Sequence, residues 1–95
     1  MIRFYVDPET GEPHIYKHEV EESEVEEILA SPGEDRRGRD GSRVAIGQTQ
    51  SGRYLKVIYI QDADRNGKFV VTAYDLVGKP LSAFRRRRRA KGGQN

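Results

Sequence analysis

The sequence predicts a small α+β domain in the order β-α-β-β-β-α, with a small antiparallel sheet and helices packed mainly on one of its faces. Runs rich in Val, Ile and Tyr alternate between apolar and polar residues and are separated by short turns. One acidic segment carries apolar residues at helical spacing. The chain has 95 residues, of which 35% are hydrophobic, and this is enough for one core only.

The first expected element is a short strand over residues 2–6, which the turn-forming pair Asp7-Pro8 ends. Residues 12–20 have no clear period, so we expect a loop with room for one helical turn. An acidic helix is then predicted over residues 21–30, with Ser23 and Glu26 at the spacing of a capping box. Its apolar stripe consists of Val25, Ile28 and Leu29. Most of its glutamates are expected to face solvent rather than to act as acids or bases.

Three strand signals follow a polar loop over residues 34–42. They cover residues 43–49, 53–60 and 68–74. The connections, Gln50-Ser51-Gly52 and a loop ending in Asn66-Gly67, are typical of hairpins. The three strands are therefore expected to form an antiparallel meander.

A last helix is predicted to begin at Gly78 and Pro80, because proline is tolerated in a first helical turn. Leu81 and Phe84 lie three residues apart and are expected to dock this helix on the sheet. The predicted domain covers residues 1–89, and residues 90–95 are expected to be a disordered tail.

Composition narrows the classes of function. The absence of cysteine excludes disulfides, cysteine-ligated zinc or iron–sulfur sites and thiol catalysis. No apolar run approaches the roughly 20 residues that span a bilayer, so we expect a cytoplasmic protein with no membrane partner. Residues 1–35 carry two basic and eleven acidic side chains, whereas residues 36–95 carry fifteen basic and four acidic ones. The basic half is suited to a polyanion, although the two halves also neutralise each other.

Two patterns are reminiscent of metal sites. Residues 62–67 match the first half of an EF-hand loop, but Ala73 stands where the loop needs a bidentate glutamate, so a hairpin turn is expected. His14 and His18 are four residues apart, but a metal would need a third ligand. A histidine in this segment is better suited to carry a proton or to contact phosphate, because imidazole titrates near neutral pH. No cofactor is expected.

The second half offers a nucleic-acid-binding surface. Five consecutive guanidiniums repel one another, and a bound polyanion would relieve this through counterion release. An acidic protein partner or a solubilising tail would also account for them. Tyr54 lies between Arg53 and Lys56 and is suited to stack on a base, whereas Tyr59 is expected in the core. The candidate nucleic-acid-binding residues are Tyr54, Arg85, Arg86, Arg87, Arg88 and Arg89.

Several motifs in order resemble the BrnT-type toxins, which are ribonucleases with a RelE-like fold in type II toxin–antitoxin systems. The central hairpin over residues 45–58 is similar to theirs. Val6-Asp7-Pro8 resembles their Trp-Asp-Pro start, and Lys17-His18-Glu19-Val20 resembles their Lys-His-Gly-Val before an acidic helix. The likeness covers roughly residues 6 to 89 and extends to related groups of uncharacterised small bacterial proteins.

The chain departs from the family pattern at three positions. Tyr74 stands where family members usually have arginine, Pro80 where they have glutamate, and Glu19 where they have glycine. If the strand arginine stabilises the cleaved phosphate in the family, its replacement by Tyr74 removes that stabilisation from this chain. The fold implied by the resemblance does not depend on this residue.

The resemblance implies a metal-independent endoribonuclease acting on RNA, free or ribosome-associated, and controlled by an antitoxin protein. Cleavage through the RNA 2′-hydroxyl needs a base, an acid and cations. The residues predicted to supply them are Lys17, His18, Arg43, Arg53 and Tyr74. The cations would be Lys17, Arg43 and Arg53, and the proton would be handled by His18 or Tyr74. The alternatives are a non-catalytic nucleic-acid-binding module and an interaction protein whose basic helix meets an acidic partner.

Overall fold

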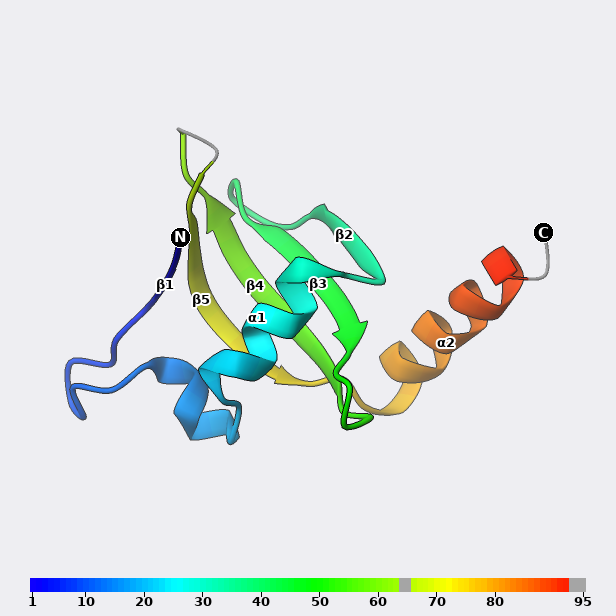
Figure 1. Ribbon diagram of the computed structural model, residues 1–95, viewed down its shortest axis with the longest axis horizontal. Helices are drawn as coiled ribbons and strands as arrows, with labels where there is room; N and C mark the ends of the chain where they lie inside the picture. The colour runs from blue at the N-terminus through cyan, green and yellow to red at the C-terminus, as the bar shows by residue number, and fades with distance from the viewer. Residues whose placement is uncertain (64–65, 93–95) are drawn as a thin grey trace.

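The computed structural model describes residues 1–63 and 66–92, and it confirms the predicted α+β class (Figure 1). Five strands form one sheet in the order β1-β5-β4-β3-β2. The strands are β1 (Ile2–Phe4), β2 (Glu34–Arg37), β3 (Arg43–Gln48), β4 (Tyr54–Gln61) and β5 (Lys68–Asp75). The helices are the 3-10 helix η1 (His14–His18), α1 (Glu22–Ala30) and α2 (Gly78–Gly92).

The predicted meander is confirmed, because β3 pairs antiparallel with β4 and β4 pairs antiparallel with β5. Strand β1 adds to the far edge of β5 in parallel, with Ile2 opposite Lys68, and covers residues 2–4 rather than 2–6. The prediction of a loop over residues 34–42 is wrong for its first part. Residues 34–37 form the edge strand β2, whose charged sequence has no apolar alternation and whose pairing with β3 decides its conformation.

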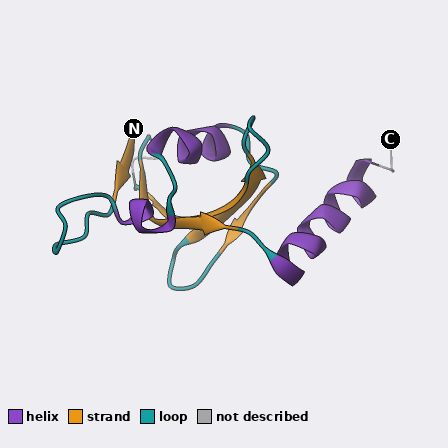
Figure 2. Cartoon of the chain, turned by 90° about the horizontal axis from the view of Figure 1, so that it is seen from below, coloured by secondary structure: helices purple, strands orange, loops and turns teal. Residues whose placement is uncertain are grey.

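Helix α1 covers one face of the sheet and builds the main core (Figure 2). Val25 and Ile28 are fully buried against the inward side chains of β3, β4 and β5. The predicted capping box at Ser23 and Glu26 is wrong by two residues. The residue before the helix is Glu21, whose backbone N–H donates to the Glu24 carboxylate at 2.9 Å, while Ser23 already lies inside the first turn.

The short helix η1 lies within residues 12–20, whose sequence shows no clear period. Ile15 is buried in the main core and holds this short helix beside β5. Glu19 ends it in the left-handed conformation, with φ of 58°. The buried Ile15 leaves the other side chains of this helix, including His14 and His18, half-buried or exposed.

Helix α2 contacts the opposite side of the sheet from α1. Phe84 and Leu81 pack with Ile46 and Leu76 in a second apolar cluster, as predicted. Ile46 points away from α1, because its neighbour Gly47 faces Ile28 of that helix and side chains alternate along a strand. Beyond this contact α2 projects from the corner of the sheet (Figures 1 and 2).

Helix α2 extends to Gly92, so residues 90–92 of the predicted tail continue the helix. Residues 93–95 of that tail lie outside the described part of the chain.

The sheet face opposite α1 is only partly covered. Lys56 lies directly opposite Tyr74, and Ile58 lies opposite Thr72. All four side chains are half-buried. We call the surface formed by these four residues the open face.

Candidate functional site

Four rings from three separate segments follow one another at the end of the open face. The ring centres of Tyr5 and His14 are 6.1 Å apart, those of His14 and His18 are 5.3 Å apart, and those of His18 and Tyr74 are 5.8 Å apart. Strand β5 supplies Tyr74, and η1 supplies both histidines. The structure therefore brings together two of the predicted catalytic residues, His18 and Tyr74, and adds His14 to them.

A buried carboxylate orients the first imidazole. Nδ1 of His14 lies 3.0 Å and 3.1 Å from the two carboxylate oxygens of Asp7. The ammonium of Lys17 lies 3.4 Å from the same carboxylate. Burial opposes ionisation of Asp7, but the hydrogen bond and charge of His14, together with Lys17, outweigh it and lower the pKa of this carboxyl. When His14 is neutral, a charged Asp7 favours the tautomer in which Nδ1–H of His14 donates to it, and this tautomer leaves Nε2 as an acceptor.

We call Asp7, His14, Lys17, His18 and Tyr74 the histidine cluster. The sequence predicts Lys17, His18 and Tyr74 in one site. It offers His14 only as an alternative to His18 for carrying a proton, and it gives Asp7 no part in the chemistry. The sequence predicts Asp7 as part of a turn and of a motif that resembles the BrnT-type start, and Asp7 does lie in a turn, since its carbonyl accepts a 2.8 Å hydrogen bond from Gly11 N–H. A carboxylate seven residues before a histidine has no periodic signal that would have joined the two.

The open face continues the cluster toward α2. The ammonium of Lys56 lies 5.9 Å from the centre of the Tyr74 ring, within the range of a cation–π contact. Tyr54 lies two residues earlier on β4 and therefore points to the same face. The guanidinium of Arg85 lies 5.9 Å from the centre of the Tyr54 ring. Rings and cations thus alternate from Tyr74 on β5 across β4 to α2.

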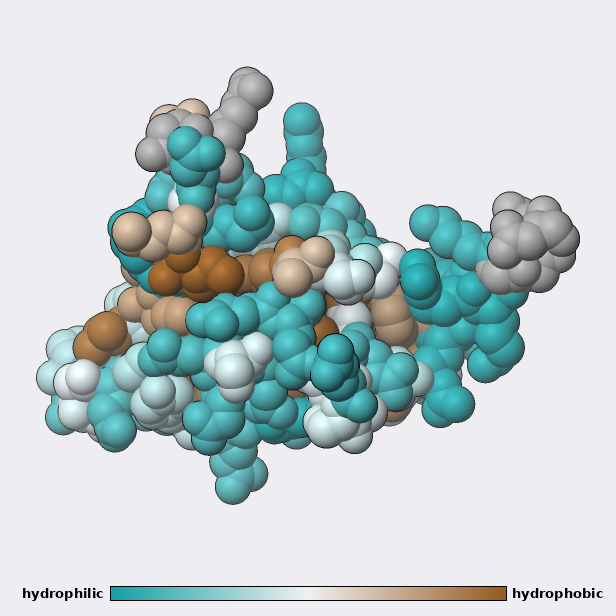
Figure 3. Space-filling view, in the orientation of Figure 1, coloured by the Kyte–Doolittle hydropathy of each residue, from teal (hydrophilic) through white to brown (hydrophobic). Residues whose placement is uncertain are grey.

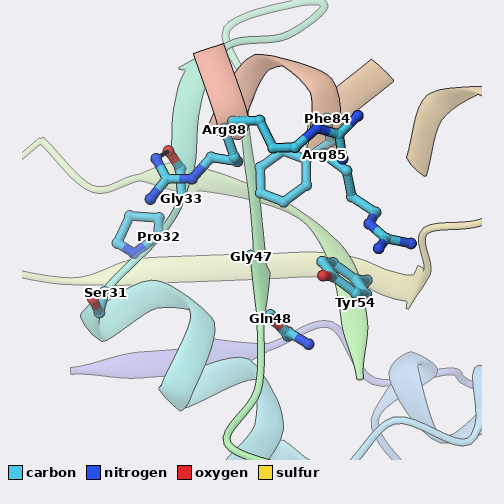
Figure 4. Close-up of a pocket in the computed structure, with 10 residues that line it drawn as sticks. Ser31, Pro32, Gly33, Gly47, Gln48, Tyr54, Phe84, Arg85 and Arg88 are labelled. Atoms are coloured by element: carbon cyan, nitrogen blue, oxygen red, sulfur yellow. Dashed lines mark hydrogen bonds between the residues drawn. The ribbon is translucent and has the colours of Figure 1, made fainter. Parts of the chain in front are cut away.

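A pocket of about 500 Å³ lies at the α2 end of this row. Its walls come from residues 31–33 after α1, from Gly47 and Gln48 of β3, from Tyr54, and from one side of α2. In Figure 4 the Arg88 side chain runs toward Gly33 and the Arg85 side chain runs toward Tyr54, with the Phe84 ring between them. The residues that α2 contributes are Phe84, Arg85, Arg88 and Arg89. We call this the arginine pocket.

Two arginines of α2 are engaged with the rest of the protein, and two others that line the arginine pocket are available. Arg87 forms a bidentate ion pair with Glu34, and this hydrogen bonding lowers the pKa of the Glu34 carboxyl. Arg88 donates a 2.9 Å hydrogen bond to the carbonyl of Gly33. Within residues 1–63 and 66–92, neither Arg85 nor Arg89 forms an ion pair with a carboxylate. The predicted nucleic-acid-binding residues are therefore divided: Arg87 is paired, Arg86 lies outside the pocket, and the others line it.

The other two predicted catalytic cations are held by carboxylates of this chain. Arg53 donates to Asp75 at 2.7 Å and to Glu24 at 2.9 Å. Arg43 donates to Asp35 at 2.9 Å, and this hydrogen bond raises the pKa of Arg43. The structure does not bring Arg43 into the histidine cluster, and Arg53 meets the cluster only through the backbone carbonyl of His18, at 3.3 Å.

The residues of the two metal-like patterns bond to other side chains of the protein. Asp62 of the EF-hand-like sequence receives two hydrogen bonds from Arg3, while Asp64 and Arg65 lie outside the described residues. His14 contacts Asp7 and the ring of His18. In the described part of the chain, no group of three or more His, Asp or Glu side chains is arranged to hold a metal ion.

Comparisons with family models, with curated proteins and with solved structures found no match to this chain. Among the described residues, no helix has both the length and the apolar character that crossing a membrane requires. Chemically, the histidine cluster joins two imidazoles, an amine, a phenol and an ionised carboxylate. Such a set can take up a proton, deliver one and stabilise negative charge.

Proposed function

We propose that this protein is a cytoplasmic, metal-independent endoribonuclease that cleaves single-stranded RNA at the histidine cluster. The observation that carries the proposal is the Asp7–His14 hydrogen bond of 3.0 Å with the His18 ring 5.3 Å beyond it. Two imidazoles side by side, one of them oriented by a carboxylate, supply a base and an acid for one phosphodiester.

The reaction that fits these groups uses the RNA itself as the nucleophile. A base removes the proton of a 2′-hydroxyl, whose oxygen then bonds to the adjacent phosphorus. The bond from phosphorus to the 5′-oxygen of the next nucleotide breaks, and an acid gives that oxygen a proton. The products are a 2′,3′-cyclic phosphate and a free 5′-hydroxyl, so the reaction consumes no metal, water or cofactor in this step.

The geometry suggests how the roles divide. His14 is the base, because Asp7 holds its Nδ1 side and leaves Nε2 to accept a proton. His18 is exposed and is the acid that protonates the leaving oxygen. Lys17 and Lys56 stabilise the additional negative charge on the phosphate, and Tyr74 donates a hydrogen bond to it. A toxin-like role, with an antitoxin protein as partner, is the biological setting that the sequence resemblance supports.

A non-catalytic nucleic-acid-binding module is the second candidate. The observation that favours it is α2, which carries the arginine run and forms the hydrophilic projection at the right of Figure 3. Such a module would bind RNA and DNA strands alike and would leave both intact.

The test incubates purified protein with end-labelled single-stranded RNA in EDTA, alongside His14→Gln and His18→Gln variants purified in parallel. We expect cleavage by the parent to yield 2′,3′-cyclic phosphate ends and each substitution to slow it about 10²- to 10⁴-fold. Tyr16→Phe is the matched control, because Tyr16 lies on η1 but its hydroxyl donates to Glu22 outside the cluster. Cleavage that both histidine variants retain at the parent's rate would refute the assignment. Binding without cleavage of RNA would favour the second candidate.

A further inference from the structure

The arginine pocket lies beyond the histidine cluster and carries groups that strand cleavage does not use. Its lining includes the Tyr54 ring and three arginines of α2, which are Arg85, Arg88 and Arg89. We infer that this pocket binds one nucleotide unit, with the base stacked at the Tyr54–Arg85 pair and the phosphate held by Arg85 and Arg89. The inference deepens the proposed function, on which its place in an RNA strand rests, by naming a second contact with the substrate.

The size and composition of the pocket fit a nucleotide. Its volume of about 500 Å³ lies within the range of pockets that enclose small ligands. Tyr54 is half-buried, and its ring meets the buried Phe84 ring at a 75° angle with centres 6.1 Å apart, so the ring is held in a fixed orientation. A fixed aromatic ring lowers the entropy that a stacking base must lose on binding.

The charge of the pocket points to an anion. Arg85 and Arg89 are exposed, line the pocket, and form no ion pair with the carboxylates of the described residues. The guanidinium of Arg85 already lies over the Tyr54 ring, and a planar guanidinium can stack on an aromatic surface while its edge donates to phosphate. Arg87 and Arg88 are engaged with Glu34 and Gly33 and therefore fix the helix rather than the ligand.

The arrangement also predicts the path of a bound single-stranded RNA across the protein. Tyr54 and Lys56 are alternate residues on β4 and share one face, and Lys56 contacts Tyr74 of the histidine cluster. An RNA strand that places one nucleotide in the arginine pocket therefore continues over Lys56 toward His18. Single-stranded nucleic acid binds to such tracks of rings and cations.

The test measures binding of adenosine 5′-monophosphate, ribose 5-phosphate and inorganic phosphate to the whole protein by titration calorimetry. None of these probes is cleaved by the proposed reaction, so the result does not depend on catalysis. We expect adenosine monophosphate to bind about 5- to 150-fold more tightly than ribose 5-phosphate, because only the former has a base to stack. Equal affinities for the two would overturn the inference.

Variants locate the site. Tyr54→Leu keeps apolar contact with Phe84 and is expected to remove the preference for the base while leaving phosphate binding unchanged. Arg89→Gln is expected to weaken all three probes at least about fivefold. Arg86→Gln is the matched control, since Arg86 has the same charge on the same helix but does not line the pocket. Equal effects of Arg86→Gln and Arg89→Gln would show non-specific attraction to α2 and overturn the inference.

A single-stranded oligonucleotide of ten uridines distinguishes a pocket for a free nucleotide from a contact within a strand. If the nucleotide unit belongs to a strand, Tyr54→Leu weakens binding of the oligonucleotide to the cleavage-deficient His14→Gln protein as well as binding of adenosine monophosphate. If only the mononucleotide is affected, the pocket binds free nucleotides and the proposed path of the strand is wrong. Cleavage by a protein that binds no mononucleotide would leave the proposed function standing and refute this inference alone.

Discussion

The guanidinium of Arg53 lies between two carboxylates, donating hydrogen bonds of 2.7 Å to Asp75 and 2.9 Å to Glu24. It also donates to the backbone carbonyls of Glu19 and His18, at 2.7 Å and 3.3 Å. One side chain thus links β5, α1 and the end of η1. These contacts, above all the one to Asp75, raise the pKa of Arg53.

The Arg53→Ala substitution is therefore expected to lower the stability of the fold. Removal of the Arg53 side chain leaves Asp75 and Glu24 without their guanidinium partner and two backbone carbonyls without a donor, so we expect the free energy of unfolding to fall by about 2–3 kcal/mol. Urea unfolding followed by circular dichroism measures this change. Arg37→Ala is the control, because Arg37 is exposed on the edge strand β2 and is expected to change stability by less than about 0.5 kcal/mol. Equal stability of the parent and Arg53→Ala proteins would contradict the structural role.

Asp7 is expected to matter for cleavage through His14. Asp7→Asn removes the negative charge that holds the His14 ring in one tautomer, so we expect cleavage of RNA to slow at least about tenfold. Binding of RNA to the two proteins should stay equal within a factor of two to three, which a filter-binding titration checks. A full cleavage rate in Asp7→Asn would exclude Asp7 from positioning the base.

Tyr59 makes the stability of the fold depend on pH in the alkaline range. Burial, reinforced by the hydrogen bond from its hydroxyl to Asp35, raises the pKa of Tyr59 to about 12. An unfolded tyrosine ionises near pH 10, so above that pH the unfolded chain releases a proton that the native chain keeps. The stabilisation is complete below about pH 10 and is lost as the pH rises toward 12, by at most about 2–3 kcal/mol.

Urea unfolding between about pH 9 and pH 12 tests this. The Tyr59→Phe variant should lose less stability across that range than the parent. Tyr5→Phe is the control for loss of a tyrosine hydroxyl, because Tyr5 is 40% exposed and its substitution leaves the Tyr59–Asp35 hydrogen bond in place. Identical pH dependence of the Tyr59→Phe and parent proteins would show that Tyr59 is not the group responsible.

Gly33 controls the docking of α2. A Cβ atom at this position would lie 2.8 Å from the Phe84 ring, which is closer than such atoms approach one another. Gly33→Ala is therefore expected to displace Phe84 and to cost about 1–3 kcal/mol of stability, with faster hydrogen exchange along α2. Ser31→Ala, two residues earlier and exposed, is the control. Unchanged exchange in α2 of the Gly33→Ala protein would mean that the helix is held by Arg87 and Arg88 alone.

The salt dependence of RNA binding should identify the free cations. Replacing Arg85 and Arg89 by glutamine is expected to reduce the slope of log K against log salt by about 0.7 for each phosphate that the protein no longer neutralises. Arg43→Gln should leave the slope unchanged, because Asp35 already neutralises that guanidinium. A change of slope in Arg43→Gln equal to that of the double variant would show that ion pairing within the chain does not select the binding cations.

Elements whose signals are local could be predicted from the sequence. The stripe of Val25, Ile28 and Leu29 predicted α1, and the alternating runs with short turns between them predicted the β3-β4-β5 meander. Leu81 and Phe84 predicted the docked side of α2. In each case apolar residues recur with the period of the helix or strand. The face that is buried can therefore be recognised from one segment of the sequence.

Pairings between distant segments could be identified only in the folded chain. Strand β2 has no period of its own and exists because β3 lies beside it. Arg53 was predicted to contact phosphate, but folding places it within reach of Asp75, which is 22 residues away in sequence. The contact of Tyr54 with Arg85 likewise depends on where α2 docks. Charge and ring contacts act over a few ångströms in space and leave no regular spacing in sequence, so only the folded chain shows which groups are paired and which remain free.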